Sequence, residues 1–98
     1  MTIEKKTNGS ALEIALEGRL DTMTAPELEA ALKDALNGVE ELTFDFEKLD
    51  YISSAGLRVL LAAQKTMNRQ GSMKVKNANE IIMEIFDVTG FADILTIE

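Results

Sequence analysis

The chain has 98 residues, 46% of them hydrophobic and 28% charged, which is enough for one compact domain over residues 1–98. It contains no cysteine and no histidine, which excludes disulfides, thiol catalysis and every imidazole-based mechanism. The formal net charge of −7 comes without a basic stripe, so nucleic acid and anionic membrane surfaces are poor partners.

Two features of the sequence bear on where the protein works. Residues 1–10 are polar and are not followed by the apolar stretch that a signal peptide needs. The longest apolar runs, such as residues 59–63, are far shorter than a membrane span. We therefore expect a cytoplasmic protein that does not insert into membranes.

The first elements are two strands. Leucine and isoleucine alternate with other residues over 11–16, which predicts a half-buried strand. A shorter alternation surrounds Ile3, and Asn8-Gly9 between the two stretches predicts a hairpin. We expect Gly18 to end the second strand.

A capped helix is predicted next. Thr24 is a good N-cap, Glu27 completes a capping box with it, and Pro26 falls in the first turn. Apolar residues over 28–36 follow at helical spacing and form one face. Asn37-Gly38 should end the helix.

The middle of the chain predicts a central strand and a second helix. Residues 42–46 are rich in β-forming residues, and a loop that contains Leu49 and Tyr51 should follow. The second helix is expected from Ser54 to about Gln70.

The last part predicts a short strand, a helix and an edge strand. Residues 73–76 alternate, and Asn79 can cap a third helix that ends near Gly90. Residues 94–97 are expected to add a final edge strand. The order β-β-α-β-α-β-α-β predicts an α/β fold with one mixed sheet of four or five strands.

Two adjacent hydroxyls, Ser53 and Ser54, lie between the predicted central strand and the second helix. Open α/β sheets tend to place their functional sites at such turns. Serine is also a preferred N-cap, so a purely structural role would explain a serine at this point. The free N–H groups and the positive end of the helix dipole would equally stabilise a phosphate on it. Spacing alone does not separate a cap from a phosphorylation switch.

The anti-sigma factor antagonists of the STAS domain family have a signature that resembles Tyr51-Ile52-Ser53-Ser54-Ala55-Gly56-Leu57. A second family landmark is similar to Gly18-Arg19-Leu20-Asp21. A third is similar to Thr89-Gly90-Phe91 followed by Ile94-Leu95. The resemblance covers essentially the whole chain, in order and at family spacing.

This resemblance implies a fold and a mechanism. The fold is a small mixed sheet with helices packed mainly on one side. An unphosphorylated antagonist binds an anti-sigma factor and so frees the sigma factor. The anti-sigma factor is also an ATP-dependent serine kinase that phosphorylates the antagonist and is released, and a metal-dependent serine phosphatase resets the cycle. We expect a protein that is not an enzyme, is monomeric when free and holds no cofactor or metal.

By resemblance, the phosphoacceptor falls on Ser54. Many family members carry aspartate immediately before it, whereas this chain has Ser53, which leaves Ser53 as an alternative acceptor. Asp21 matches a family acid near the phosphoserine, and Asp45 is a further acid that could point toward the same end of the sheet, where a strand-end hydrogen bond is the simpler role. The expected partner-binding residues are Asp21, Thr22, Ser53, Ser54, Gly56 and Arg58. Arg58, one turn after Ser54, could pair with a phosphate or with an acid of the partner.

Two other functions remain open. A standalone STAS subunit could dock on another assembly, such as the cytoplasmic side of a lipid-transport ATPase, with phosphorylation incidental. An enzyme is disfavoured because the chain has no P-loop, no histidine, no metal-ligand cluster and no lysine beside the serine pair in sequence.

Overall fold

Four strands form one sheet in the order β1-β2-β3-β4 in the computed structural model, which describes residues 1–98. The elements are β1 (Thr2–Asn8), β2 (Ala11–Leu20), α1 (Ala25–Ala35), β3 (Glu41–Ile52), α2 (Ser54–Gln70), β4 (Ser72–Lys76), α3 (Glu80–Thr89) and the 3₁₀ helix η1 (Phe91–Asp93). β1 is antiparallel to β2, while the β2–β3 and β3–β4 pairs are parallel. The predicted mixed α/β fold is confirmed.

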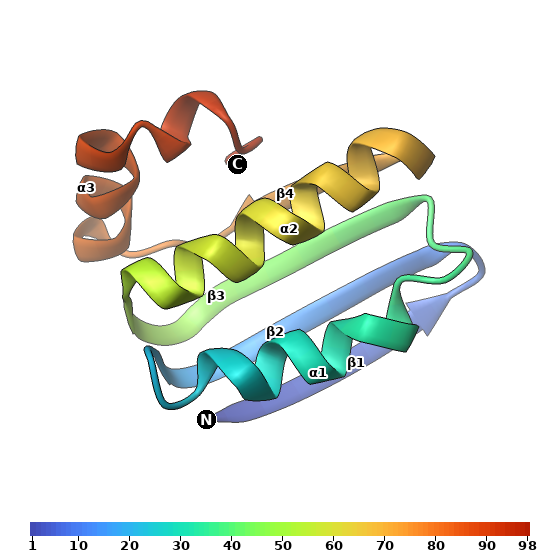
Figure 1. Cartoon of the computed structure of the whole chain (residues 1–98), viewed down its shortest axis with the longest axis horizontal. Coiled ribbons are helices and arrows are strands. Elements are labelled where there is room, and N and C mark those ends of the chain that lie inside the picture. Colours follow the sequence, from blue (N-terminus) through green and yellow to red (C-terminus); the bar gives the residue numbers. More distant parts are fainter.

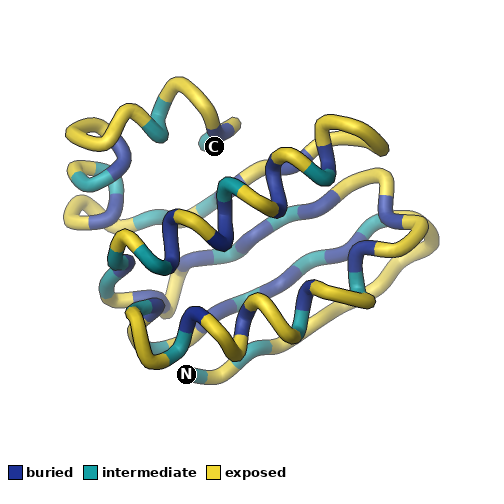
Figure 2. Tube along the Cα trace, viewed as in Figure 1, coloured by how far each residue is buried: buried dark blue, intermediate teal, exposed yellow.

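Helices cover one face of the sheet and leave the other face open. α1 and α2 lie side by side over the strands, while α3 stands at the end of the sheet where β3 finishes (Figure 1). Buried positions, dark blue in Figure 2, recur along the central strands and along the helices. This one-sided packing agrees with the expected arrangement. None of the helices combines the length and the apolar composition of a membrane span.

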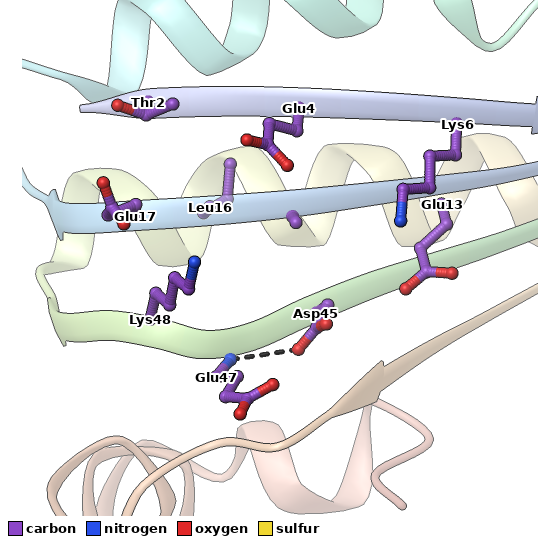
Figure 3. Close-up of a pocket in the computed structure, with 10 residues that line it drawn as sticks. Thr2, Glu4, Lys6, Glu13, Leu16, Glu17, Asp45, Glu47 and Lys48 are labelled. Atoms are coloured by element: carbon purple, nitrogen blue, oxygen red, sulfur yellow. Dashed lines mark hydrogen bonds between the residues drawn. The ribbon is translucent and has the colours of Figure 1, made fainter.

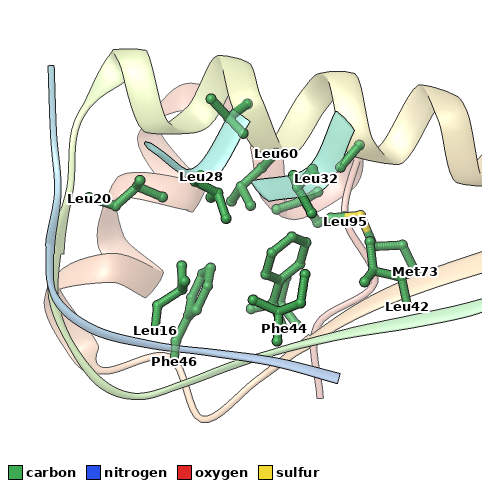
Figure 4. Packing of buried hydrophobic residues seen from close by; sticks show 14 of the residues in the cluster. Leu16, Leu20, Leu28, Leu32, Leu42, Phe44, Phe46, Leu60, Met73 and Leu95 are labelled. Atoms are coloured by element: carbon green, nitrogen blue, oxygen red, sulfur yellow. The ribbon is translucent and has the colours of Figure 1, made fainter. Parts of the chain in front are cut away.

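The core lies between the sheet and its two covering helices. Phe44 and Phe46 of β3 are fully buried, with ring centroids 5.9 Å apart, and leucines of α1 and α2 pack over them (Figure 4). Burying a side chain of this size contributes about 1.5–3 kcal/mol. The core therefore holds α2 firmly above β3, the strand that leads into it.

The predicted hairpin is present, but Gly18 does not end the second strand. β1 and β2 are joined at Gly9, which has a φ of +62°. β2 continues through Gly18, where φ is +105° beside a shift of register with β3, as far as Leu20. Leu20 is fully buried, and its burial favours the continued strand.

The loop predicted around Leu49 and Tyr51 is wrong, because β3 runs on to Ile52. Strict alternation of buried residues stops at Phe46, which made the following residues look irregular. β3 has one extra residue at each of two register shifts against β2. Such bulges change which face a side chain points to, so Leu49 and Ile52 are buried at intervals of three residues.

The start of α1 also differs from the prediction. Thr24 occupies the N-cap position, but its side chain makes no capping hydrogen bond, so the capping box with Glu27 is wrong. The Thr24 hydroxyl instead donates to the backbone oxygen of Arg19 (2.7 Å) and accepts from the backbone N–H of Asp21 (2.8 Å). The Thr24 hydroxyl therefore stabilises the loop before α1 and does not cap the helix.

The C-terminal part follows the prediction for α3 and departs from it afterwards. The Asn79 side chain accepts from the backbone N–H of Ile82 (2.8 Å), and Gly90 ends the helix with a φ of +82°. The expected final strand is reduced to a single parallel bridge between Ile97 and Val75 of β4. The sheet therefore has four strands.

Candidate functional site

The candidate site is formed by the loops after β2 and β3. These parallel strands end at the same edge of the sheet, so the loops that lead into α1 and α2 meet there. The backbone N–H of Ser53 donates to the backbone oxygen of Leu20 at 2.8 Å, which ties the two loops together. Asp21 and Thr22 are thereby brought beside Ser53 and Ser54.

The two serines occupy different positions at the start of α2. Ser53 is the N-cap, in an extended conformation, and its Oγ accepts from the backbone N–H of Gly56 at 3.4 Å. Ser54 is the first helical residue; it is exposed, and its hydroxyl makes no hydrogen bond within the chain. The predicted start of the helix at Ser54 is confirmed, and the cap, which the sequence alone does not assign to either serine, is Ser53. Ser53 therefore caps the helix, and Ser54 has the free hydroxyl.

Gly56 lies beneath the site rather than on its surface. It is buried, and a Cβ atom at this position would lie 2.7 Å from Cγ of Leu20 and 2.9 Å from Cγ1 of Ile52. The first turn of α2 therefore packs directly on the ends of β2 and β3. Among the expected partner-binding residues, Gly56 is placed to position the serines.

Asp21 organises the loop between β2 and α1. Its Oδ1 accepts from the backbone N–H groups of Met23 (3.0 Å) and Thr24 (3.2 Å), and from the Thr24 hydroxyl (3.3 Å). Together with the bonds of Thr24 described above, these contacts close the loop on both sides. An aspartate that accepts from the N–H two residues on is a common way to fix a turn.

The environment of Asp21 favours its ionised form. Partial burial would raise the pKa of the carboxyl, but the backbone N–H groups of Thr24 and Met23 and the Thr24 hydroxyl donate to the carboxylate. The charge of Arg19 acts in the same direction, and together these groups hold the pKa of Asp21 below its usual range.

Arg19 and Tyr51 belong to the same edge, although neither was among the predicted site residues. The Arg19 guanidinium lies 4.5 Å from the centre of the Tyr51 ring, and its Nε is 3.7 Å from Oδ2 of Asp21. The two residues are paired in register across β2 and β3. The sequence analysis placed Tyr51 in a loop. A strand that continued to Tyr51 would have predicted its pairing with Arg19.

The exposed residues around Ser54 come from both loops and from α2. Thr22, Arg58 and Ala55 line a shallow depression between the start of α1 and the start of α2. Arg58 is exposed and makes no ion pair within the chain. Met23, which sequence reasoning missed, is 84% exposed at the tip of the β2–α1 loop.

Asp45 does not belong to this site. It lies in the middle of β3 on the open face of the sheet, among charged side chains (Figure 3). Its Oδ1 accepts from the side-chain amide of Asn77 (2.9 Å) and the backbone N–H of Glu47 (3.0 Å). Burial would raise the pKa of Asp45, but these two bonds and the charges of Lys76 and Lys6 lower it. The expected hydrogen-bonding role holds, but within the strand rather than at its end, and no cluster of acids is arranged to hold a metal ion.

Comparisons with known proteins agree on one family. A family model described as "Mlab, STAS domain" matches residues 3–96. The chain is 29% identical to the anti-sigma-B factor antagonist of Bacillus subtilis, over 99% of this chain and 90% of that protein. It is 34% identical to BtrV of Bordetella bronchiseptica, provisionally named an anti-sigma factor antagonist, over 84% of this chain and 72% of that protein.

Solved structures share the fold. The unphosphorylated form of the anti-sigma factor antagonist SpoIIAA superposes with a TM-score of 0.78 at 18% identity, over 99% of this chain and 87% of that one. The phosphorylated form of SpoIIAA from Bacillus gives a TM-score of 0.77 at 18% identity, over 99% of this chain and 91% of that one. At this identity the likeness establishes the fold alone.

Proposed function

The chain belongs to the STAS domain family, and we propose that it is an anti-sigma factor antagonist controlled by phosphorylation of Ser54. In its unphosphorylated form it binds an anti-sigma factor and makes the sigma factor available. The names of the relatives from Bacillus subtilis and Bordetella bronchiseptica support this role. In the proposed cycle the anti-sigma factor is also the serine kinase, and a metal-dependent serine phosphatase restores the binding form. The proposal places the protein in the cytoplasm as a single STAS domain, monomeric when free, that acts by binding rather than catalysis.

The observation that carries the proposal is the free, exposed hydroxyl of Ser54 at the first position of α2. A kinase must reach the acceptor oxygen, and here no intramolecular hydrogen bond has to be broken first. Ser53 already caps the helix, so modification of Ser54 leaves the cap in place. A phosphate at this helix start is further stabilised by unpaired N–H groups and by the helix dipole.

The switch follows from the charge that a phosphate adds. At neutral pH it carries about −1.5 to −2 charges. An interface that covers Ser54 and its neighbours Thr22 and Arg58 would have to bury that charge, and an unpaired or like charge in an interface costs about 2–5 kcal/mol. Release therefore needs no refolding of the domain. Arg58, free of ion pairs and one turn away, is available to an acid of the partner or to the phosphate itself.

Phosphopeptide mapping tests the acceptor. The protein is incubated with its cognate anti-sigma factor kinase and Mg-ATP, and the modified residue is identified by mass spectrometry. We expect one phosphate on Ser54, loss of labelling in Ser54→Ala, and retained labelling in Ser53→Ala. The Ser53 variant is the matched control, since it removes the neighbouring hydroxyl and costs about 1 kcal/mol of capping stability.

Two results would count against this account. Labelling of Ser54→Ala at the wild-type level would move the acceptor to another residue, with Ser53 the first candidate. Absence of labelling by any kinase of this type would favour a standalone subunit that docks constitutively on another assembly, such as a lipid-transport ATPase.

A further inference from the structure

A large apolar side chain is exposed on the β2–α1 loop, which the bond between Ser53 and Leu20 ties to the start of α2. Met23 is 84% exposed, the largest exposed fraction of any large apolar side chain in the protein. We propose that Met23 is the anchor by which the unphosphorylated protein docks, filling an apolar pocket on its anti-sigma factor. This inference rests on the proposed function and adds the residue that supplies the apolar contact.

The loop holds Met23 in a fixed place. Its own backbone N–H donates to Oδ1 of Asp21, and the next residue, Thr24, makes side-chain bonds to the backbone of Asp21 and Arg19 on the other side of the tip. The backbone N–H of Ala25 also donates to the backbone oxygen of Asp21 at 2.8 Å. The backbone of a pre-ordered loop loses little conformational entropy on binding, so the ordering cost is confined to the Met23 side chain.

Met23 lies on the loop that is tied to the start of α2, where Ser54 is exposed. The hydrogen bond between Ser53 and Leu20 fixes the β2–α1 loop against the start of α2, so a partner that covers Ser54 also covers this loop. Thr22 and Arg58 are polar and exposed, and they line a depression that Pro26 and Ala55 also line. Binding energy in protein interfaces concentrates in a few apolar or aromatic anchors surrounded by polar contacts that exclude water. Methionine suits this role because it is flexible and adapts to the shape of a pocket.

The remaining exposed apolar side chains lie elsewhere and supply a control. Val88, in the last turn of α3, is 78% exposed. Figure 1 places that end of α3 away from the β2–α1 loop, with the start of α2 between them. Val88 therefore matches Met23 in exposure but not in position.

The test measures the affinity of the full chain for the purified anti-sigma factor kinase from the same genome, by isothermal titration with unphosphorylated protein. We expect Met23→Ala to raise the Kd about tenfold or more, as truncation of an interface anchor does. Met23→Leu, which preserves apolar volume, should stay within about threefold of wild type. Val88→Ala should stay within about twofold, since surface substitutions outside an interface have small effects.

The outcomes separate the anchor from the proposed function. If wild type binds and Met23→Ala binds as tightly as Val88→Ala, Met23 is not the anchor and the proposed function stands. If Met23→Leu is as weak as Met23→Ala, an apolar pocket is not what receives the side chain, and the inference is overturned. If wild-type protein itself does not bind, the proposed function fails and the anchor fails with it.

Discussion

Ser53 and Ser54 differ in environment although they are adjacent in sequence. Ser53 accepts a backbone N–H and holds the helix start, while Ser54 presents an unbonded hydroxyl to solvent. The two serines predicted a helix cap and a candidate phosphoacceptor, but the sequence could not say which serine has which role. The two roles depend on where the paired strands β2 and β3 end. The backbone bond from Ser53 to Leu20 lies at that end, so α2 begins at the next residue.

Two substitutions of Asp21 separate the role of its charge from the role of its hydrogen bonds. Asp21→Asn keeps the Oδ1 acceptor for the N–H groups of Met23 and Thr24, and loses only the charge and the ion pair with Arg19. An exposed ion pair contributes little, so we expect the Kd for the anti-sigma factor to rise at most about fivefold. Asp21→Ala removes the acceptor and frees the loop, so its Kd should rise about tenfold or more. Titration of both variants measures the difference.

Equal loss of binding in Asp21→Asn and Asp21→Ala would contradict this account. It would mean that the partner recognises the carboxylate charge itself rather than the loop that Asp21 shapes. Circular dichroism of both variants provides the control that the fold is retained.

At the scale of elements, the sequence predicted the strands and helices better than their junctions. α2 was predicted over its observed length, because its start and its stop at Gly71 are both marked by local residue chemistry. The course of β3 was missed, since its bulges against β2 break the period of two on which strand prediction depends. The contact of Arg19 with Tyr51 was missed for the same reason. Local sequence patterns predict where helices and strands form, whereas packing determines the register between strands that are distant in sequence.

The junction between α2 and the sheet yields a stability prediction. In Gly56→Ala the new methyl group meets Leu20 and Ile52, which are both buried and have little room to move. Overpacking of this kind costs about 1–3 kcal/mol, against a gain of up to about 1 kcal/mol from the better helix propensity of alanine. We expect a net loss of about 1–2 kcal/mol in the free energy of unfolding, measured by urea denaturation.

Ala62→Gly tests the propensity term separately, because Ala62 is exposed in the middle of the same helix. It should lower the free energy of unfolding by about 1 kcal/mol through propensity alone. If Gly56→Ala were instead more stable than wild type, Leu20 and Ile52 would have to move to accept the methyl group. Close packing would then not fix the position of the serines.

In the whole molecule, the core and the proposed phosphorylation site lie in different places. The helices cover one face of the sheet, the charged open face lies on the other side, and the site occupies the edge where β2 and β3 end. Ser54, Met23 and Arg58 are all exposed there, so adding a phosphate changes surface charge without disturbing buried contacts. We therefore expect the domain to remain folded with and without a phosphate on Ser54.

We propose that phosphorylation of Ser54 alone separates the binding form from the released form. The most direct measurement is the Kd of the anti-sigma factor for the unphosphorylated protein and for protein phosphorylated on Ser54, titrated under the same conditions, with circular dichroism of both forms. We expect the phosphorylated form to bind at least about a hundredfold more weakly with an unchanged spectrum. Equal affinities of the two forms, or loss of the folded spectrum on phosphorylation, would contradict it.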